Sequence, residues 1–357
     1  MRRLHLFALS LLPVCFGVGC PTGTLPGGTP TIGSTISTAT PLTLDSNEKA
    51  VLSSTIEGSK VDVYDLGAVS PGDRIIVSVR PSMGSSLDPT TAIFDESSVL
   101  FAINDDADTA AGRVDSAIDD YIAIGGDHIY LAISKYFFAN VGGAYEGDVE
   151  IRRGQTAPTA PQQVLLLNFA SGSVTIPDEG TFTYGVFDAA DIDATYAGQT
   201  AAIKAKIIEV VKQNYQQFGI NIISSDDPPV DNTNCVVSTI HFGAFSQTKF
   251  GIAQSVDDAN RKRCDDGIVF TDDFDKPFTP KPSVDGIAIA IANVAAHEAG
   301  HLLGLNHTTD ITDLMDTTGS ASTLLADQEF KTAALAPSIF PFGKQDGVAM
   351  LNRVIPK

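Results

Sequence analysis

Positively charged residues are scarce in this sequence. Among its 357 residues, 23 are Lys or Arg and 43 are Asp or Glu, so the formal net charge is -20. Nucleic acids and anionic membrane surfaces are bound through clustered Lys and Arg, so this composition argues against both partners. The simplest interpretation of this negative charge is an acidic surface in contact with solvent. The alternative is a surface that binds a specific cationic partner.

Cysteine is also scarce. Two of the four cysteines, Cys15 and Cys20, stand close to the start of the chain, which leaves Cys235 and Cys264 as the pair in the rest of the sequence. Neither has the spacing of a zinc finger, which argues against a structural cysteine site for zinc. In an exported protein this pair predicts one disulfide, and two free thiols are the alternative.

The apolar run near the start is too short to span a bilayer. It covers residues 4–18, follows two arginines and is interrupted by Pro13, so residues 1–20 are predicted to be a signal peptide. Cys20 follows Gly17-Val18-Gly19, which resembles the lipid-attachment box of bacterial lipoproteins, although Gly17 replaces the usual aliphatic residue. The resemblance implies a secreted, cell-surface or outer-membrane-associated protein of a bacterium, either lipidated at Cys20 or released by ordinary cleavage.

Two stretches divide the remaining chain. Residues 21–41 consist mainly of Thr, Gly, Ser and Pro without charge, and residues 154–162 repeat this character, so both are predicted to be linkers. The chain is longer than one hydrophobic core usually supports. We therefore expect two domains, at 42–153 and 163–357, and expect the protein to be a monomer.

Short alternating apolar runs fill the first of these domains. Breaks such as Ser70-Pro71-Gly72-Asp73 separate the runs, and this pattern predicts an all-β antiparallel sandwich. The alternating residues include Val61, Val63, Ile75, Val77, Val79, Ile118, Ile122, Ile124, Ile129, Leu131, Ile133, Val149 and Ile151. The phrases "VDVYDLGAVSPGDRIIVSV" and "LDPTTAIFDESSVLFAINDDAD" resemble the bacterial pre-peptidase C-terminal domain. The resemblance implies a jelly-roll module with an accessory role beside a secreted peptidase.

Four of the five residues from 104 to 108 have oxygen-bearing side chains. This stretch is a candidate Ca²⁺ site, and a polar turn is the alternative.

The second domain contains patterns typical of strands and patterns typical of helices. Apolar runs at 164–169, 220–223, 236–240 and 267–270 predict strands, and apolar residues recur at helical spacing between Tyr196 and Phe218. A strand, a long helix and further strands predict an α+β domain in which helices pack on a mixed sheet.

The decisive motif follows an apolar run that predicts a long buried helix. On that helix His297 and His301 are four residues apart, so both rings emerge on one face, where two imidazoles can bind one zinc ion. Glu298 stands beside the metal as the candidate general base. Gly304 permits a left-handed turn at the helix end, which brings back His307 as the third ligand.

These residues carry the pattern H-E-x-x-H-x-x-G-x-x-H and resemble the metzincin zinc peptidases, most closely the matrixins. The resemblance implies a Met-turn at Met315 beneath the metal, and strand pairing of an extended substrate along Gly251-Ile252-Ala253. The residues after Met315 lack the Pro-x-Tyr that forms the matrixin specificity wall. Asp272 and Asp273 align loosely with a matrixin calcium loop, and an acidic surface turn is the alternative.

The sequence thus predicts a zinc-dependent endopeptidase that acts on protein or peptide, with membrane contact only through a lipid on Cys20. The alternative is a non-catalytic surface lipoprotein, whose sandwich binds glycan or protein and whose zinc is structural. A zinc hydrolase of non-peptide amides is a further alternative. Glu298 favours an enzyme, because a structural site needs no carboxylate beside an open coordination position.

Overall fold

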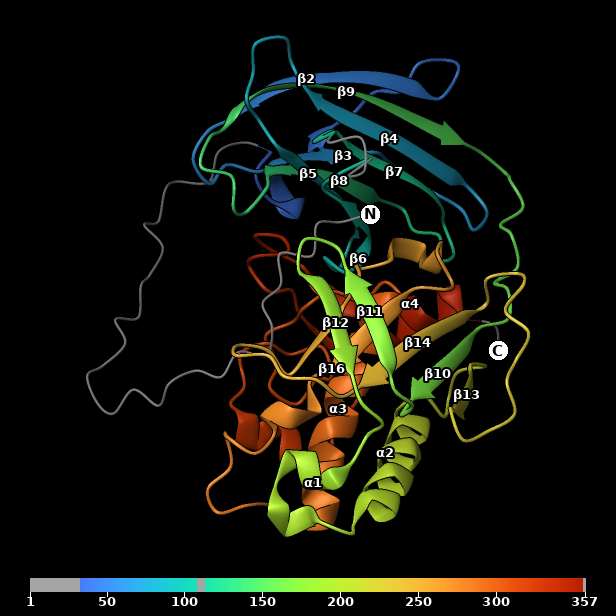
Figure 1. The fold of residues 1–357 in the computed structure, drawn as a ribbon. Helices are drawn as coiled ribbons and strands as arrows, with labels where there is room; N and C mark the ends of the chain where they lie inside the picture. Colours follow the sequence, from blue (N-terminus) through green and yellow to red (C-terminus); the bar gives the residue numbers. More distant parts are fainter. Residues whose placement is uncertain (1–32, 108–112, 356–357) are drawn as a thin grey trace.

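A computed structural model describes residues 33–107 and 113–355 (Figure 1). The predicted signal peptide and Cys20 lie outside the described residues, and so does Asp108 of the first calcium candidate. Within the described ranges, every helix is too short or too polar to cross a membrane.

Two packed sheets form the first half of the chain. One sheet has the order β1-β3-β8-β5-β6 and the other β2-β9-β4-β7. The strands are β1 Thr40–Pro41, β2 Lys49–Ile56, β3 Asp62–Asp65, β4 Arg74–Pro81, β5 Pro89–Asp95, β6 Leu100–Asn104, β7 Ser116–Tyr121, β8 Ile129–Lys135 and β9 Gly143–Arg152. Burial alternates along β4, which places Ile75, Val77 and Val79 in the core between the sheets. The period-two pattern of the sequence has this cause, because successive side chains of a strand point to opposite faces.

The start of this half differs from its prediction. Residues 33–41 belong to the predicted linker, yet they hold a 3₁₀ turn, Ile36–Thr38, and strand β1. Strand β1 pairs in parallel with β3, while the other ladders of the two sheets are antiparallel. Ile36 packs against buried residues of the sandwich, and this apolar contact orders a stretch whose composition suggested flexibility.

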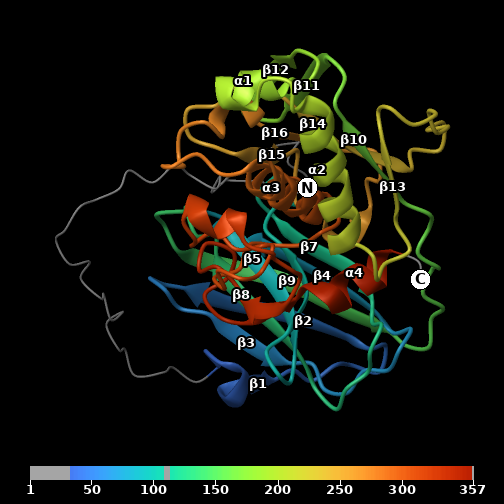
Figure 2. The same ribbon diagram turned by 90° about the horizontal axis from the view of Figure 1, so that it is seen from below.

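A mixed sheet forms the centre of the second half, in the order β13-β10-β14-β16-β15. Its ladders are parallel except for β15, which pairs antiparallel with β16 at the edge. The strands are β10 Val164–Asn168, β13 Asn221–Ser224, β14 Val237–Phe242, β15 Gly251–Ala253 and β16 Asp266–Val269. Helices α2, Thr200–Asn214, and α3, Val284–Leu302, pack on one face of the sheet and share its largest core (Figure 2). A hairpin of β11, Gly172–Ile176, and β12, Gly180–Tyr184, covers the other face.

Helix α3 carries the predicted motif and is buried along most of its length. The Ser283 side chain caps its start by accepting a hydrogen bond from the Gly286 N–H at 3.1 Å. The helix ends at Leu302, and Gly304 follows at φ +93°, a conformation that glycine adopts without strain. The predicted stop at Gly304 therefore has the expected backbone geometry.

The remaining elements are short, and several were not predicted. They are α1 Ala189–Ile192, β17 Thr332–Ala334, β18 Lys344–Asp346, α4 Gly347–Val354 and the 3₁₀ turns Ala194–Tyr196, Asp258–Asn260, Thr271–Asp273 and Ala321–Leu325. The predicted disulfide is present between Cys235 and Cys264, whose Cα atoms are 4.9 Å apart. It ties the chain before β14 to the chain before β16, which are neighbouring strands of the sheet.

Candidate metal centre

Three buried histidines converge at the end of α3. Nε2 of His301 lies 3.1 Å from Nε2 of His297 and 2.9 Å from Nε2 of His307. Their exposed fractions are 7%, 2% and 4% for His297, His301 and His307. In the described part of the chain this is the one group of His, Cys, Asp or Glu residues placed to hold a metal ion.

Hydrogen bonds to backbone carbonyls fix the orientation of two rings. Nδ1 of His297 is 2.6 Å from the carbonyl oxygen of Leu314, and Nδ1 of His301 is 2.8 Å from that of Leu305. Because a carbonyl oxygen only accepts, each Nδ1 carries the hydrogen, and each Nε2 presents a lone pair. Burial also lowers the pKa of His297 to about 4, which keeps this ring neutral.

The lone pairs fit one small cation. With their hydrogens on Nδ1, the Nε2 atoms of His297 and His301 face each other at 3.1 Å with two lone pairs, an arrangement that a cation between them would stabilise. A tetrahedral zinc ion that binds imidazoles at about 2.0–2.1 Å holds their nitrogens roughly 3.3 Å apart, which is close to this spacing. With its carbonyl-oriented imidazoles, the triad therefore has the donor chemistry of a zinc site with an open fourth position.

Met315 packs beneath the helix that carries the histidines and is fully buried. A Cβ added to Gly300 would lie only 2.6 Å from Sδ of Met315, so the glycine of the motif leaves room for this contact. The Met315 carbonyl accepts a hydrogen bond from the N–H of Thr308, one residue after the third histidine. The methionine segment thus supports both α3 and the chain that follows it.

Glu298 lies between α3 and the edge strand β15. It is 5% exposed, and its carboxylate accepts a hydrogen bond from the backbone N–H of Ala253. Burial raises its pKa to about 8, against the opposing effect of that hydrogen bond and of Lys249. A Cβ at Gly251 would lie 2.6 Å from Oε1 of Glu298. The absence of a side chain at Gly251 therefore lets the carboxylate lie flat against the strand, a requirement that the sequence alone did not reveal.

Neither calcium candidate is supported by the described residues. Asp273 is fully buried and pairs with the ammonium group of Lys276 at 2.7 Å, and it also accepts a hydrogen bond from the Ser246 N–H. A carboxylate already neutralised by an ammonium group is a poor cation ligand. At residues 104–107, the Asn104 side chain bonds the backbone of Asp106 and Ala117, as in a polar turn.

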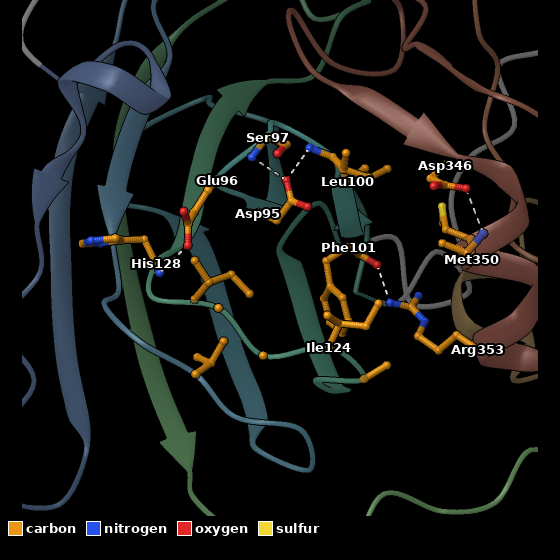
Figure 3. A pocket seen from close by; sticks show the side chains of 17 residues that line it. Asp95, Glu96, Ser97, Leu100, Phe101, Ile124, His128, Asp346, Met350 and Arg353 are labelled. Atoms are coloured by element: carbon orange, nitrogen blue, oxygen red, sulfur yellow. Dashed lines mark hydrogen bonds between the residues drawn. The ribbon is translucent and has the colours of Figure 1, made fainter.

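A cavity of about 370 Å³ lies away from the histidines, between the sandwich and α4 (Figure 3). Its acidic side chains Asp95 and Glu96 already accept hydrogen bonds from backbone N–H groups. Asp95 accepts hydrogen bonds from the N–H groups of Ser97 and Val99, and Glu96 accepts one from the N–H of His128 at 3.2 Å. The cavity is therefore a boundary between two parts of the fold rather than a second cluster of reactive groups.

Two buried imidazoles on helix α3 and a third just beyond its end converge beside a mixed sheet, an arrangement that resembles the metal site of metzincin peptidases. Residues 228–330, less than a third of the chain, match the family model "Matrixin", and this segment contains the three histidines and Met315. The match supports a zinc-dependent peptidase at that coarse level. No curated protein matches the chain.

Among solved structures, the archaemetzincin of Methanopyrus kandleri is 13% identical, with a TM-score of 0.26 over 50% of this chain and 89% of its own. A zinc-dependent peptidase of Methanocorpusculum labreanum is 16% identical, with a TM-score of 0.23 over 45% of this chain and 91% of its own. A periplasmic inhibitor of g-type lysozyme from Aeromonas hydrophila is 15% identical, with a TM-score of 0.26 over 32% of this chain and 95% of its own. These scores are too low to establish a shared fold.

Proposed function

We propose that this protein is an exported zinc-dependent endopeptidase in which His297, His301 and His307 hold the metal and Glu298 is the general base. The observation that carries the proposal is the convergence of three buried imidazole nitrogens next to a buried carboxylate. A purely structural zinc site has no use for Glu298, which burial makes more basic than an ordinary glutamate.

When bound, zinc supplies Lewis-acid polarisation of a carbonyl and lowers the pKa of a water molecule to about 7. The residues of the chain carry out the proton transfers. The Glu298 carboxylate takes a proton from the attacking water and returns it to the departing amine nitrogen. The Nδ1 hydrogens of His297 and His301 are directed to the carbonyls of Leu314 and Leu305, which leaves the Nε2 lone pair of each ring to bind the metal.

Strand β15 is the proposed binding edge for substrate. Within the described residues this buried strand has one ladder partner, β16, and an extended peptide is proposed to pair with its other edge. The Ala253 N–H that bonds Glu298 belongs to the same strand. A peptide laid along β15 would therefore lie next to the general base.

The remaining segments of the chain are proposed to export the enzyme and to anchor it. We propose a jelly-roll module of the pre-peptidase C-terminal type at 42–153, a catalytic domain at 163–357 and export by residues 1–20, with a lipid on Cys20. Protein or peptide is the proposed substrate, and the proposed membrane contact is through that lipid. Mass spectrometry of the mature N-terminus tests the lipid, since an unmodified start elsewhere than Cys20 would remove the anchor.

A peptide library tests the enzymatic proposal directly. The purified protein is expected to contain about one zinc per chain, measured by elemental mass spectrometry, and to cleave library peptides at internal bonds. Removal of zinc with a chelator should stop cleavage, and added zinc should restore it. A protein that holds zinc and cleaves no library peptide would instead favour the non-catalytic surface protein.

Gly251→Ala should impair cleavage while the metal stays bound. The added methyl group would meet Glu298 at 2.6 Å and Val294 at 2.7 Å, so the carboxylate must move away from the strand. A displacement of about 1 Å at a reacting group can cost roughly a hundredfold in rate, and we expect kcat to fall by about 10- to 100-fold. Steady-state kinetics with a cleaved library peptide, together with zinc content, measure this effect.

Gly267→Ala is the matched control on the neighbouring strand. Its added methyl group would meet Cδ1 of Ile240 at 2.9 Å and the carbonyl oxygen of Ile252 at 3.3 Å, and Glu298 is not among its nearest neighbours. This variant should lose some stability and keep its kcat. Equal losses of kcat in both variants would show that disturbing the sheet, and not moving Glu298, lowers the rate.

A further inference from the structure

The third histidine lacks the support that the helix gives to the first two. His307 follows Gly304 in an irregular segment, whereas His297 and His301 lie within α3. The residue before it, Asn306, is fully buried, so its backbone N–H and C=O need partners within the protein. These partners determine where the third imidazole stands.

A single buried glutamine satisfies both backbone groups of Asn306. Oε1 of Gln345 accepts from the Asn306 N–H at 2.6 Å, and Nε2 of Gln345 donates to the Asn306 carbonyl at 2.9 Å. Gln345 is itself fully buried and lies on β18. Its amide therefore replaces the backbone partner that a regular strand would have supplied.

The hairpin of β17 and β18 also bonds the backbone of His307 itself and that of Thr309. The N–H of Ala336 donates to the His307 carbonyl at 2.9 Å, and the N–H of Thr309 donates to the Ala334 carbonyl at 3.0 Å. Ala333 pairs with Gln345 across the hairpin. The segment from Asn306 to Thr309 is thus fastened to this hairpin at successive residues.

The loop of the same hairpin packs against the sandwich through a buried phenylalanine. Phe340 is 1% exposed, and its ring centroid lies 5.5 Å from that of Phe94, which is fully buried on β5. Phe342 lies 5.0 Å from the same ring. A Cβ at Gly343 would lie 2.4 Å from Cε1 of Phe94, so the hairpin backbone presses directly on this phenylalanine. Phe94 therefore fixes the position of the hairpin loop.

Hydrogen bonds extend this contact along the edge of the sandwich. The N–H of Lys344 donates to the Ser98 carbonyl at 2.9 Å, next to Gln345 in the sequence. After β18, Arg353 of α4 donates to the Phe101 carbonyl at 2.6 Å and lies over the Phe101 ring (Figure 3). The strand that carries Gln345 is thus attached to the sandwich on both sides.

We propose that Gln345 is a positioning residue for His307, and that the sandwich holds Gln345 in place through the β17–β18 hairpin. The affinity for zinc then depends on a domain that supplies no ligand. This inference rests on the proposed zinc site. Loss of a residue that orients a metal ligand typically costs 10- to 100-fold in metal affinity.

Gln345→Leu tests the first step, because leucine keeps much of the volume and removes both hydrogen bonds to the backbone of Asn306, together with a longer one from the Asn306 side chain. The zinc dissociation constant, measured by competition with a fluorescent chelator, is expected to rise by about 10- to 100-fold. Gln345→Glu retains an acceptor for the Asn306 N–H and should lie between Gln345→Leu and wild type. It also decides the question if the leucine variant does not fold.

Gln163→Leu is the matched control. Gln163 is the other fully buried glutamine of the catalytic half, and it bonds Ser238 and backbone carbonyls rather than the segment of His307. This variant should lose stability and keep the zinc affinity of the wild type. An unchanged zinc affinity in both Gln345 variants would overturn the inference, whereas a wild-type protein that takes up no zinc would overturn the proposed function itself.

Two neighbours on β5 test the second step. Phe94 faces the hairpin, and Ile93 faces the core between the two sheets of the sandwich. Phe94→Ala should weaken zinc binding, while Ile93→Ala should lower the stability of the sandwich and leave zinc binding unchanged. Equal zinc affinities in the two variants would show that the sandwich does not act on the metal centre through the hairpin.

Discussion

Glu298→Gln is expected to remove nearly all peptide cleavage while about one zinc remains bound per chain. The side chain does not belong to the histidine triad, and glutamine has nearly the same volume, so the buried space beside β15 stays filled. An amide cannot accept the proton that the carboxylate takes from water. The loss of a general base typically costs 10²- to 10⁴-fold, and kcat should fall by about that factor. Single-turnover cleavage of a library peptide and elemental analysis measure the two outcomes.

Asp265→Asn provides the matched control for removing a buried acid. Asp265 is fully buried, burial raises its pKa to about 7, and it accepts a hydrogen bond from Ser238 at 2.6 Å. Because Asp265 is not part of the proposed active site, its replacement should leave kcat unchanged.

If Glu298→Gln cleaved at the wild-type rate, another group would have to be the base. If it lost zinc, Glu298 would be supporting the metal site instead.

The candidate site could be predicted from the sequence because its geometry is local. His297 and His301 share a face of one helix through the helical repeat alone, and Gly304 marks the point at which the chain leaves that helix. Eleven residues therefore contain most of the information about the metal centre. The supports of Glu298 and His307 come from Gly251 and Gln345, which are distant in the sequence, and no local pattern reveals such contacts.

The same distinction between local patterns and distant contacts applies to the fold. Alternation predicted the sandwich strands and helical spacing predicted α2, since burial on one face leaves a trace in the sequence, whereas an unbroken apolar run predicted α3. Strands β17 and β18 have three residues each, too few for a period to show. Their partners are set by tertiary packing, in which the loop between them is buried against Phe94. No pattern in the sequence indicated that the sandwich packs against the second half of the chain, as it does in the structure.

Among the substitutions considered, Gly304→Ala should have the largest effect after Glu298→Gln. It should lower both the stability of the protein and its affinity for zinc. At φ +93° a residue with a side chain is strained by about 1–2 kcal/mol. In addition, the new Cβ would lie 2.9 Å from the carbonyl oxygen of Asp257, a backbone atom that cannot swing aside. The turn after α3 must then open, which moves His307 away from the other two imidazoles. We expect the free energy of unfolding to fall by more than the strain alone, and the zinc dissociation constant to rise at least roughly tenfold.

Gly198→Ala separates strain from displacement. Gly198 has a comparable φ of +79°, and an added Cβ there would meet no atom within 4 Å. Its replacement should cost about 1–2 kcal/mol of stability through the backbone alone and leave zinc affinity unchanged. Chemical denaturation of the zinc-free proteins gives the two free energies, and chelator competition gives the two affinities. Equal stability losses, with zinc binding intact in both variants, would mean that the turn at Gly304 adapts to a side chain, and that His307 does not depend on it for its place beside His301.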